Sequence, residues 1–142
     1  MERIVILGLK RNNGSVPEES IRILETVGSW MDRNNRAIYG AEKCQVRRSN
    51  YANFTRKGNI LYVHAHFWPG STLTVAGLTT PVKSARLLAS GARVNVFQDR
   101  FRVRFTGLPE TAPDSPVTVI AAECASEPKQ DTDFVRKERK RI

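Results

Sequence analysis

The chain has 142 residues, of which 40% are hydrophobic and 26% charged, and it carries a formal net charge of +9. This composition is typical of a globular protein with one core, and it excludes a chain that is disordered throughout. No segment contains the ~20 consecutive apolar residues of a membrane-spanning helix, and the apolar run near the N-terminus is shorter than the ~7–15 residues of a secretion signal. The sequence as given therefore predicts a soluble, cytoplasmic protein.

Residues 4–7 (IVIL) predict the first element, a strand that is apolar on both faces. Such strands are typical of parallel sheets, in which helices cover both faces and other strands cover both edges. A single helix follows in this chain before the pattern changes. We therefore expect the strand to belong to a larger α/β unit.

A capping-box pattern at Ser15 and Glu18, with Pro17 in the first turn, marks the start of a predicted helix. Apolar side chains then recur at steps of three and four residues. They are Ile21, Leu24, Val27 and Met31. Polar and charged side chains occupy the other side, and Asn34 and Asn35 mark the predicted end. The pattern is that of an amphipathic helix.

After Gly40 the helical period disappears, and short segments of β-forming residues recur at intervals of roughly ten residues. They cover residues 60–67, 72–75, 93–96, 100–105 and 117–122. Turns that contain glycine or proline separate them. In the segment 100–105 we expect Phe101, Val103 and Phe105 to face the core. The pattern predicts a mainly β fold, an antiparallel β-sandwich.

The composition changes again near the C-terminus. Residues 126–142 contain few apolar side chains, and five of the last seven residues are Lys or Arg. The predicted division is therefore residues 1–40 for the strand and helix, 41–125 for the β-sandwich, and 126–142 for a basic, disordered tail.

Cys44 and Cys124 are the only cysteines, and their spacing fits neither a CxxC motif nor a metal site. A bridge between them would need Cα atoms within ~7 Å, which leaves their pairing open at this stage. We expect two free or buried thiols, and no metal or cofactor.

Three residues are candidate carbohydrate contacts: His64, His66 and Trp68. The histidines are two apart on a predicted strand, so both should project from one face. No third ligand accompanies them, which favours a structural or surface role over a metal pair. Trp68 could stack on a sugar ring, although an aromatic that anchors the turn is the simpler interpretation.

Arg100, Arg102 and Arg104 form a basic ladder on one face of a predicted strand. A phosphate-binding stripe has this pattern, and so does the solvated face of an outer strand. No aromatic platform for bases accompanies the arginines, which argues against nucleic-acid binding.

Three ordered segments carry a family resemblance. Residues 14–40 (GSVPEESIRILETVGSWMDRNNRAIYG) are followed by residues 54–70 (FTRKGNILYVHAHFWPG) and 77–88 (GLTTPVKSARLL). Together they resemble the C-terminal portion of family 29 glycoside hydrolases, the α-L-fucosidases: the end of the catalytic (β/α) barrel and then the C-terminal β-sandwich. The matching positions of the first segment are Gly14, Pro17, Gly28, Trp30, Asn34, Ala37, Ile38, Tyr39 and Gly40.

The resemblance implies a fragment of an α-L-fucosidase, in which Trp30 packs against the barrel or the sandwich. Retaining hydrolysis needs two carboxyl groups ~5–5.5 Å apart, and in that family they lie on upstream barrel strands. No residue of this chain inherits a catalytic role, so whether it acts as an enzyme is left open. We expect an accessory structural domain that is inactive alone.

The partners expected from the resemblance are the missing catalytic barrel, or a second copy that covers the exposed barrel remnant. One alternative function is a carbohydrate-binding β-sandwich module that recognises fucosylated glycans. The other is a basic nucleic-acid-binding protein.

Overall fold

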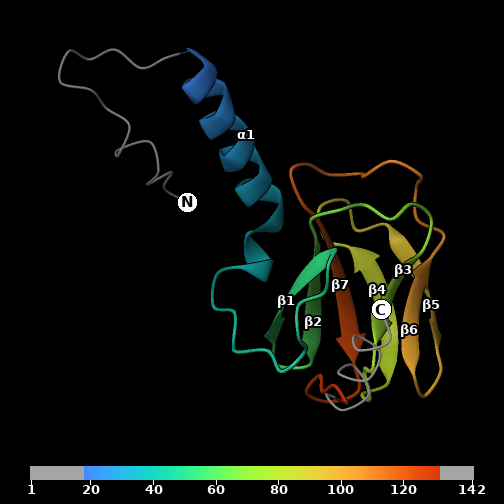
Figure 1. The fold of residues 1–142 in the computed structure, drawn as a ribbon. Coiled ribbons are helices and arrows are strands. Elements are labelled where there is room, and N and C mark those ends of the chain that lie inside the picture. Colours follow the sequence, from blue (N-terminus) through green and yellow to red (C-terminus); the bar gives the residue numbers. More distant parts are fainter. Residues whose placement is uncertain (1–17, 132–142) are drawn as a thin grey trace.

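The computed structural model describes residues 18–131, in which one helix precedes an all-β domain (Figure 1). The strand predicted at residues 4–7 and most of the tail predicted at 126–142 lie outside these residues. Helix α1 spans Glu18–Asn34 and continues into one turn of 3-10 helix, η2, at Asn35–Ala37. The predicted amphipathic helix and its end at Asn34 are confirmed, while its predicted start at Ser15 and Pro17 lies outside the described residues.

Seven strands form one antiparallel sheet within the described residues. Their bounds are β1 Ala52–Lys57, β2 Ile60–Ala65, β3 Leu73–Ala76, β4 Val82–Leu87, β5 Arg93–Gln98, β6 Arg102–Thr106 and β7 Thr118–Cys124. The order across the sheet is β1-β2-β7-β4-β5-β6-β3, and every pairing is antiparallel. The predicted mainly β fold is therefore confirmed.

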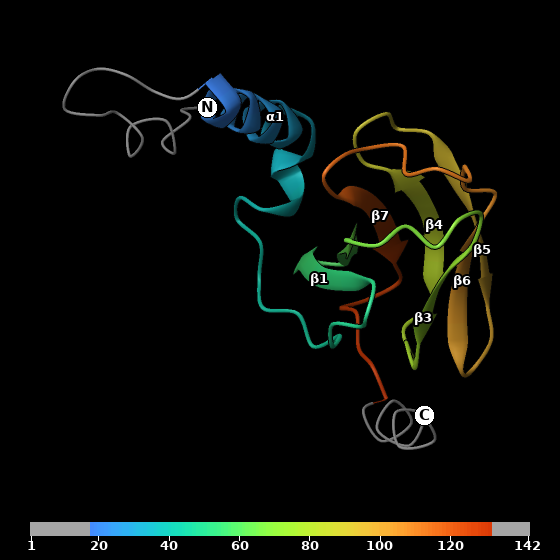
Figure 2. The ribbon, with the colours of Figure 1, turned by 45° about the horizontal axis from the view of Figure 1, so that its top comes forward.

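The sheet curls strongly, so that β3 and β6 come to lie opposite the β1-β2-β7-β4 side, as in a sandwich (Figure 2). β5 lies where the sheet turns. Its Val94 pairs with Ala85 of β4, whereas its Val96 pairs with Phe105 of β6. β5 thus connects the two sides, and both sides of the sandwich belong to one continuous sheet.

The main core fills the space inside this curl. Leu61 and Val63 of β2, Ile120 of β7, and Val103 and Phe105 of β6 are completely buried in it. β2 and β7 are central strands whose residues are almost all buried, because helix α1 covers part of their outer face. In the described part of the chain, no helix has the length and apolar character needed to cross a membrane.

The sequence-based prediction for Phe101 is wrong. β6 begins only at Arg102, and Phe101 lies in the preceding turn with 42% of its surface exposed. Asp99 holds this turn, because its Oδ1 accepts hydrogen bonds from the backbone N–H groups of Phe101 and Arg102 at 2.7 and 2.9 Å. The Asx turn delays the start of the strand and turns Phe101 away from the core.

Both cysteines are free thiols, as predicted. Cys124 is buried in the main core, and burial raises its pKa to about 11. Cys44 packs against the same core, and its pKa is also raised, mainly by burial. A raised pKa keeps a thiol protonated and unreactive at neutral pH.

The core predicts the effect of truncating Phe105. We expect Phe105→Ala to lower the free energy of unfolding by about 3–5 kcal/mol, since it removes a fully buried ring and leaves a cavity. Phe97→Ala on the neighbouring strand β5 is the matched control, because that ring is 63% exposed. It should change stability by less than ~0.5 kcal/mol. Urea unfolding of both variants measures the difference, and equal losses would contradict this account of the core.

Candidate functional site

The junction between helix α1 and the outer face of the sheet is the most elaborate feature of the described residues. Trp30 is 8% exposed and packs with Tyr62, Val119 and Ala121 in a second hydrophobic cluster. Its indole Nε1–H donates a hydrogen bond to the backbone oxygen of Val117 at 2.6 Å. The last turns of the helix are therefore fixed to β2 and β7 by both packing and a directed bond.

A polar network closes the junction beside Trp30. Arg33 Nη2 donates to Asp114 Oδ1 at 2.7 Å, and Asn34 Nδ2 donates to Asp114 Oδ2 at 2.9 Å. Asn34 also donates to the backbone oxygen of Trp30, and Ser115 N donates back to Asp114 Oδ1. A single carboxylate in the loop between β6 and β7 thus receives donors from the helix and from its own loop.

The electrostatics of Asp114 agree with this geometry. Its side chain is 9% exposed, and burial alone would raise the carboxyl pKa. Hydrogen bonds from Arg33, Asn34 and Ser115 outweigh burial and hold the pKa of Asp114 below its usual value. The carboxylate is thus ionised at neutral pH, and it holds the loop to the helix.

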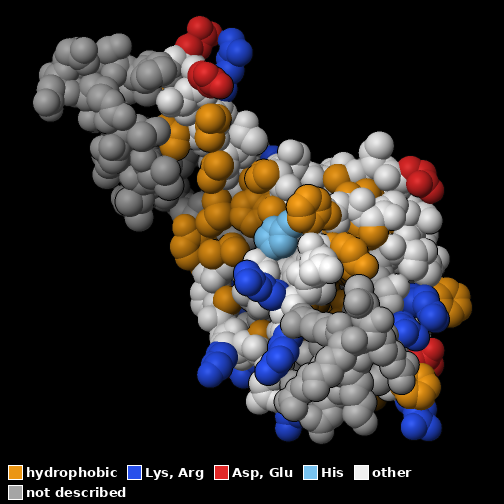
Figure 3. Space-filling model, viewed as in Figure 1, with side chains coloured by type: hydrophobic (Ala, Val, Ile, Leu, Met, Phe, Trp, Pro, Cys, Tyr) orange, Lys and Arg blue, Asp and Glu red, His pale blue; other side chains and the backbone are white. Residues whose placement is uncertain are grey.

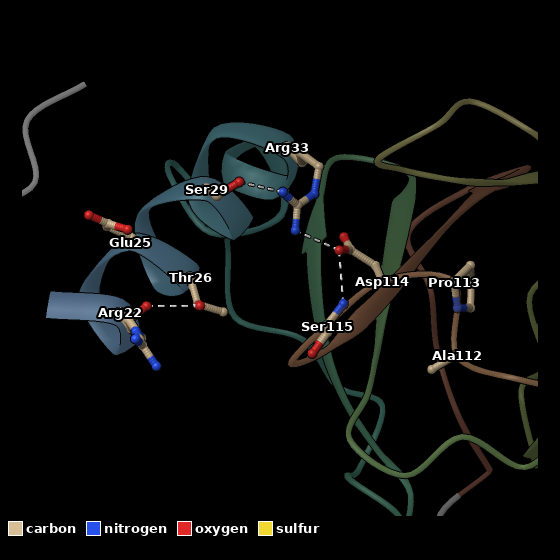
Figure 4. Close-up of a pocket in the computed structure, with 9 residues that line it drawn as sticks. All are labelled: Arg22, Glu25, Thr26, Ser29, Arg33, Ala112, Pro113, Asp114 and Ser115. Carbon is tan, nitrogen blue, oxygen red and sulfur yellow. Dashed lines mark hydrogen bonds and ion pairs between the residues drawn. The ribbon is translucent and has the colours of Figure 1, made fainter. Parts of the chain in front are cut away.

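An open groove of about 650 Å³ runs between the helix and this loop (Figure 4). Arg33 extends across it toward Asp114, whereas Glu25 points away from the loop (Figure 4). The other lining side chains are Arg22, Thr26, Ser29, Ala112, Pro113 and Ser115. No aromatic side chain lines the groove, so it lacks the flat apolar surface on which a sugar ring stacks.

A second link joins the end of the helical segment to the sheet. Thr55 Oγ1 of β1 donates to the backbone oxygen of Ala37 at 2.8 Å and lies 2.8 Å from Nε2 of His64 on β2. His64 is buried, and burial lowers its pKa to about 4, with a smaller contribution from the charge of His66. His64 is therefore neutral at physiological pH and part of the junction.

The structure separates the three predicted carbohydrate contacts. His64 is buried within β2, while His66 follows the end of that strand and is exposed. Trp68 packs against the main core, and its Nε1–H donates to the backbone oxygen of Pro109 at 2.8 Å. None of the three lines the groove beside Asp114. Within residues 18–131, no group of His, Cys, Asp and Glu side chains could hold a metal ion.

Sequence reasoning missed the roles of Asp114 and Arg33. In the sequence, Asp114 lies in a proline-containing segment and Arg33 near the end of the predicted helix, and no local pattern marks either residue as functional. The two are 81 residues apart, so nothing in the local sequence links them. Trp30, in contrast, was predicted to pack against the barrel or the sandwich, and it packs against the sandwich.

Comparison with known proteins gives matches at the level of structure. No protein-family model and no curated protein sequence matches the chain. α-L-Fucosidase isoenzyme 1 from Paenibacillus thiaminolyticus is 31% identical over 80% of this chain and 28% of that chain, with a TM-score of 0.70. The α-L-fucosidase from Vibrio sp. strain EJY3 is 23% identical over 84% of this chain and 22% of that chain, with a TM-score of 0.69. A GH29 α-L-fucosidase from Bacteroides thetaiotaomicron is 24% identical over 80% of this chain and 26% of that chain, with a TM-score of 0.65.

The fold and the junction define a β-sandwich-like domain that is docked to one amphipathic helix. The chain spans only about a quarter of the length of the fucosidases that it matches. These matches confirm the predicted resemblance to the family 29 α-L-fucosidases, and the small share of each enzyme that is covered agrees with a fragment of such a chain.

The burial of His64 predicts a pH dependence of stability. Between pH 6.5 and about 4 the unfolded chain binds a proton at His64 that the folded chain does not. Stability should therefore fall as the pH is lowered through this range. Urea unfolding at several pH values should show this loss in the natural chain and a smaller loss in His64→Gln.

His66→Gln is the matched control, because the exposed His66 lies outside the strand. It should keep most of the pH dependence of the natural chain. The same pH dependence in His64→Gln and the natural chain would contradict the buried, neutral state of His64.

Proposed function

We propose that this chain is the structural C-terminal part of an α-L-fucosidase and that it stabilises a catalytic barrel by offering the apolar face of helix α1 to it. The observation that carries the proposal is that the sheet buries only the C-terminal part of this face and leaves the rest exposed. Ile23, Val27 and Trp30 are separated by four and three residues, so they lie along one line of the helix. The sheet buries Trp30, but Ile23 and Val27 are 58% and 37% exposed.

The uncovered apolar surface extends beyond these two side chains. Ile21 on the helix, and Ile38 and Tyr39 just after it, are also exposed. Hydrophobic side chains run along the helix and continue across the junction onto the sheet domain (Figure 3). Contiguous apolar surface of this kind is typical of a face that another protein segment covers.

The length of the related enzymes supports a barrel as the covering segment. The three fucosidases above are matched over only 22–28% of their chains, so most of each enzyme lies outside the match. In this proposal the junction fixes the angle of the helix, and the uncovered line packs on the neighbouring barrel elements. Self-association through the same face is the competing arrangement.

The described carboxylates support a structural role over hydrolysis by this chain alone. A glycosidase acid needs a raised pKa. The two carboxyl groups with a resolved shift, Asp99 and Asp114, both have lowered pKa values. Asp99 holds a turn, and Asp114 holds the junction.

The alternative functions receive less support. For a carbohydrate-binding module, the indole of Trp68 is engaged with Pro109 and the core. For a nucleic-acid-binding protein, the basic ladder is interrupted, because Arg100 precedes β6 and lies 4.8 Å from the ring centre of Phe101. Arg104 is within 3.9 Å of the carboxylate of Asp99.

A chimeric enzyme tests the proposal. The segment of the Paenibacillus thiaminolyticus fucosidase that this chain matches is replaced by this chain. We expect the chimera to hydrolyse an aryl α-L-fucoside and the chain alone to release no fucose. Val27→Glu in the chimera should lower the free energy of unfolding by about 3–5 kcal/mol, because it buries an unpaired charge.

Thr26→Glu introduces the same charge on the adjacent, polar side of the helix and is the matched control. It should leave the chimera nearly unchanged. In the chain alone, both substitutions should be tolerated equally, since neither position is covered there. Equal tolerance of both in the chimera, or fucose release by the chain alone, would contradict the proposal.

A further inference from the structure

Two arginines face each other on the outer side of the sheet, beside the Trp30 cluster, whose Ala121 lines the same hollow. In the register of β4 and β5, Arg86 lies directly opposite Arg93. Like charges at directly opposed positions of an antiparallel pair are destabilising. Within residues 18–131, neither guanidinium forms an ion pair or a hydrogen bond. The pair is thus a concentration of positive charge with no directly bonded anionic partner among these residues.

The backbone around the pair is held tightly. The short connection between β4 and β5 is closed by hydrogen bonds from Leu87 N to Ala92 O and from Gly91 N to Leu87 O, both 2.8 Å. Gly91 contributes no side chain, and a Cβ there would meet nothing within 4 Å. The backbone positions of Arg86 and Arg93 are therefore fixed, and the space beside Gly91 is open to a ligand.

The arginines line a hollow of about 250 Å³. This volume is below the ~300–1,000 Å³ of pockets that hold drug-sized ligands, so it suits an ion or one small group. Ser84 and Glu123 also line it, and they are opposite each other on β4 and β7. The charged groups of the hollow are thus two guanidinium groups and one carboxylate.

We propose that this hollow is a binding site for a tetrahedral oxyanion, a sulfate or phosphate group, held between Arg86 and Arg93. Each guanidinium can donate two parallel hydrogen bonds to such a group, and a bound dianion removes the repulsion between the arginines. Ser84 supplies a hydroxyl donor at the same site. Glu123 repels a free anion, but it can accept a hydrogen bond from a hydroxyl group beside a sulfate or phosphate ester. This inference goes beyond the proposed structural role and does not depend on it.

Titration of the isotope-labelled full chain tests the proposal by NMR. The ligands are inorganic sulfate, inorganic phosphate and a sulfated fucose, with unmodified fucose as the neutral control and ionic strength held constant. We expect saturable shifts at Arg86, Gly91 and Arg93. Arg86→Ala and Arg93→Ala should each weaken binding at least about tenfold, the effect of losing a charge-assisted hydrogen bond.

Arg104→Ala removes the same charge from β6 and should keep the affinity of the natural chain. Tighter binding of the sulfated sugar would identify an ester as the ligand, and tighter binding of the inorganic ions would identify a free anion. Thermal unfolding gives a second readout, because sulfate should stabilise the natural chain and not Arg86→Ala. Shifts that do not saturate, or equal affinities in Arg86→Ala and Arg104→Ala, would overturn the proposal.

Discussion

The contact between Trp30 and β7 is the constraint on which the arrangement of helix and sheet depends. The indole ring packs on Tyr62, Val119 and Ala121, and its N–H reaches the backbone oxygen of Val117. The hydrophobic cluster around Trp30 lies apart from the main core inside the curled sheet. No residue of helix α1 belongs to the main core, so the apolar contact between helix and sheet is made through the cluster around Trp30.

Polar side chains add direction to this apolar contact. Asp114 accepts hydrogen bonds from two neighbouring helical residues, and Thr55 holds the turn that follows the helix. These bonds lie at the C-terminal end of α1, so the rest of the helix projects away from the sheet (Figure 1). The apolar line of the helix continues from the buried Trp30 toward the N-terminus through the exposed Val27 and Ile23. A projecting helix with an uncovered apolar face is the geometry expected of a segment that completes a larger neighbouring domain.

Much of the fold could be predicted from the sequence, and the failures have physical causes. β2 and β7 were predictable because nearly all their residues are buried, and β6 because its buried residues alternate with exposed ones. The sequence did not predict β1 or β4. β1 (ANFTRK) lies at the sheet edge and is largely polar, and an irregularity between Val82 and Ser84 breaks the alternation of β4. Trp30 could be predicted as a packing residue. The Arg33–Asp114 pair and the Arg86–Arg93 pair could not, because each depends on which distant segments the fold brings together.

Hydrogen exchange along α1 in the full chain tests the central claim most directly, since it reports local opening at each backbone amide. If the Trp30 junction fixes the helix, amides from Trp30 to Asn34 should be protected nearly as well as those of β7. Amides from Ile21 to Val27 should exchange faster, because the large apolar side chains Ile21, Ile23 and Val27 are exposed on that part of the helix. Equally fast exchange along the whole helix would contradict the account, since it would mean that the helix is not docked on the sheet.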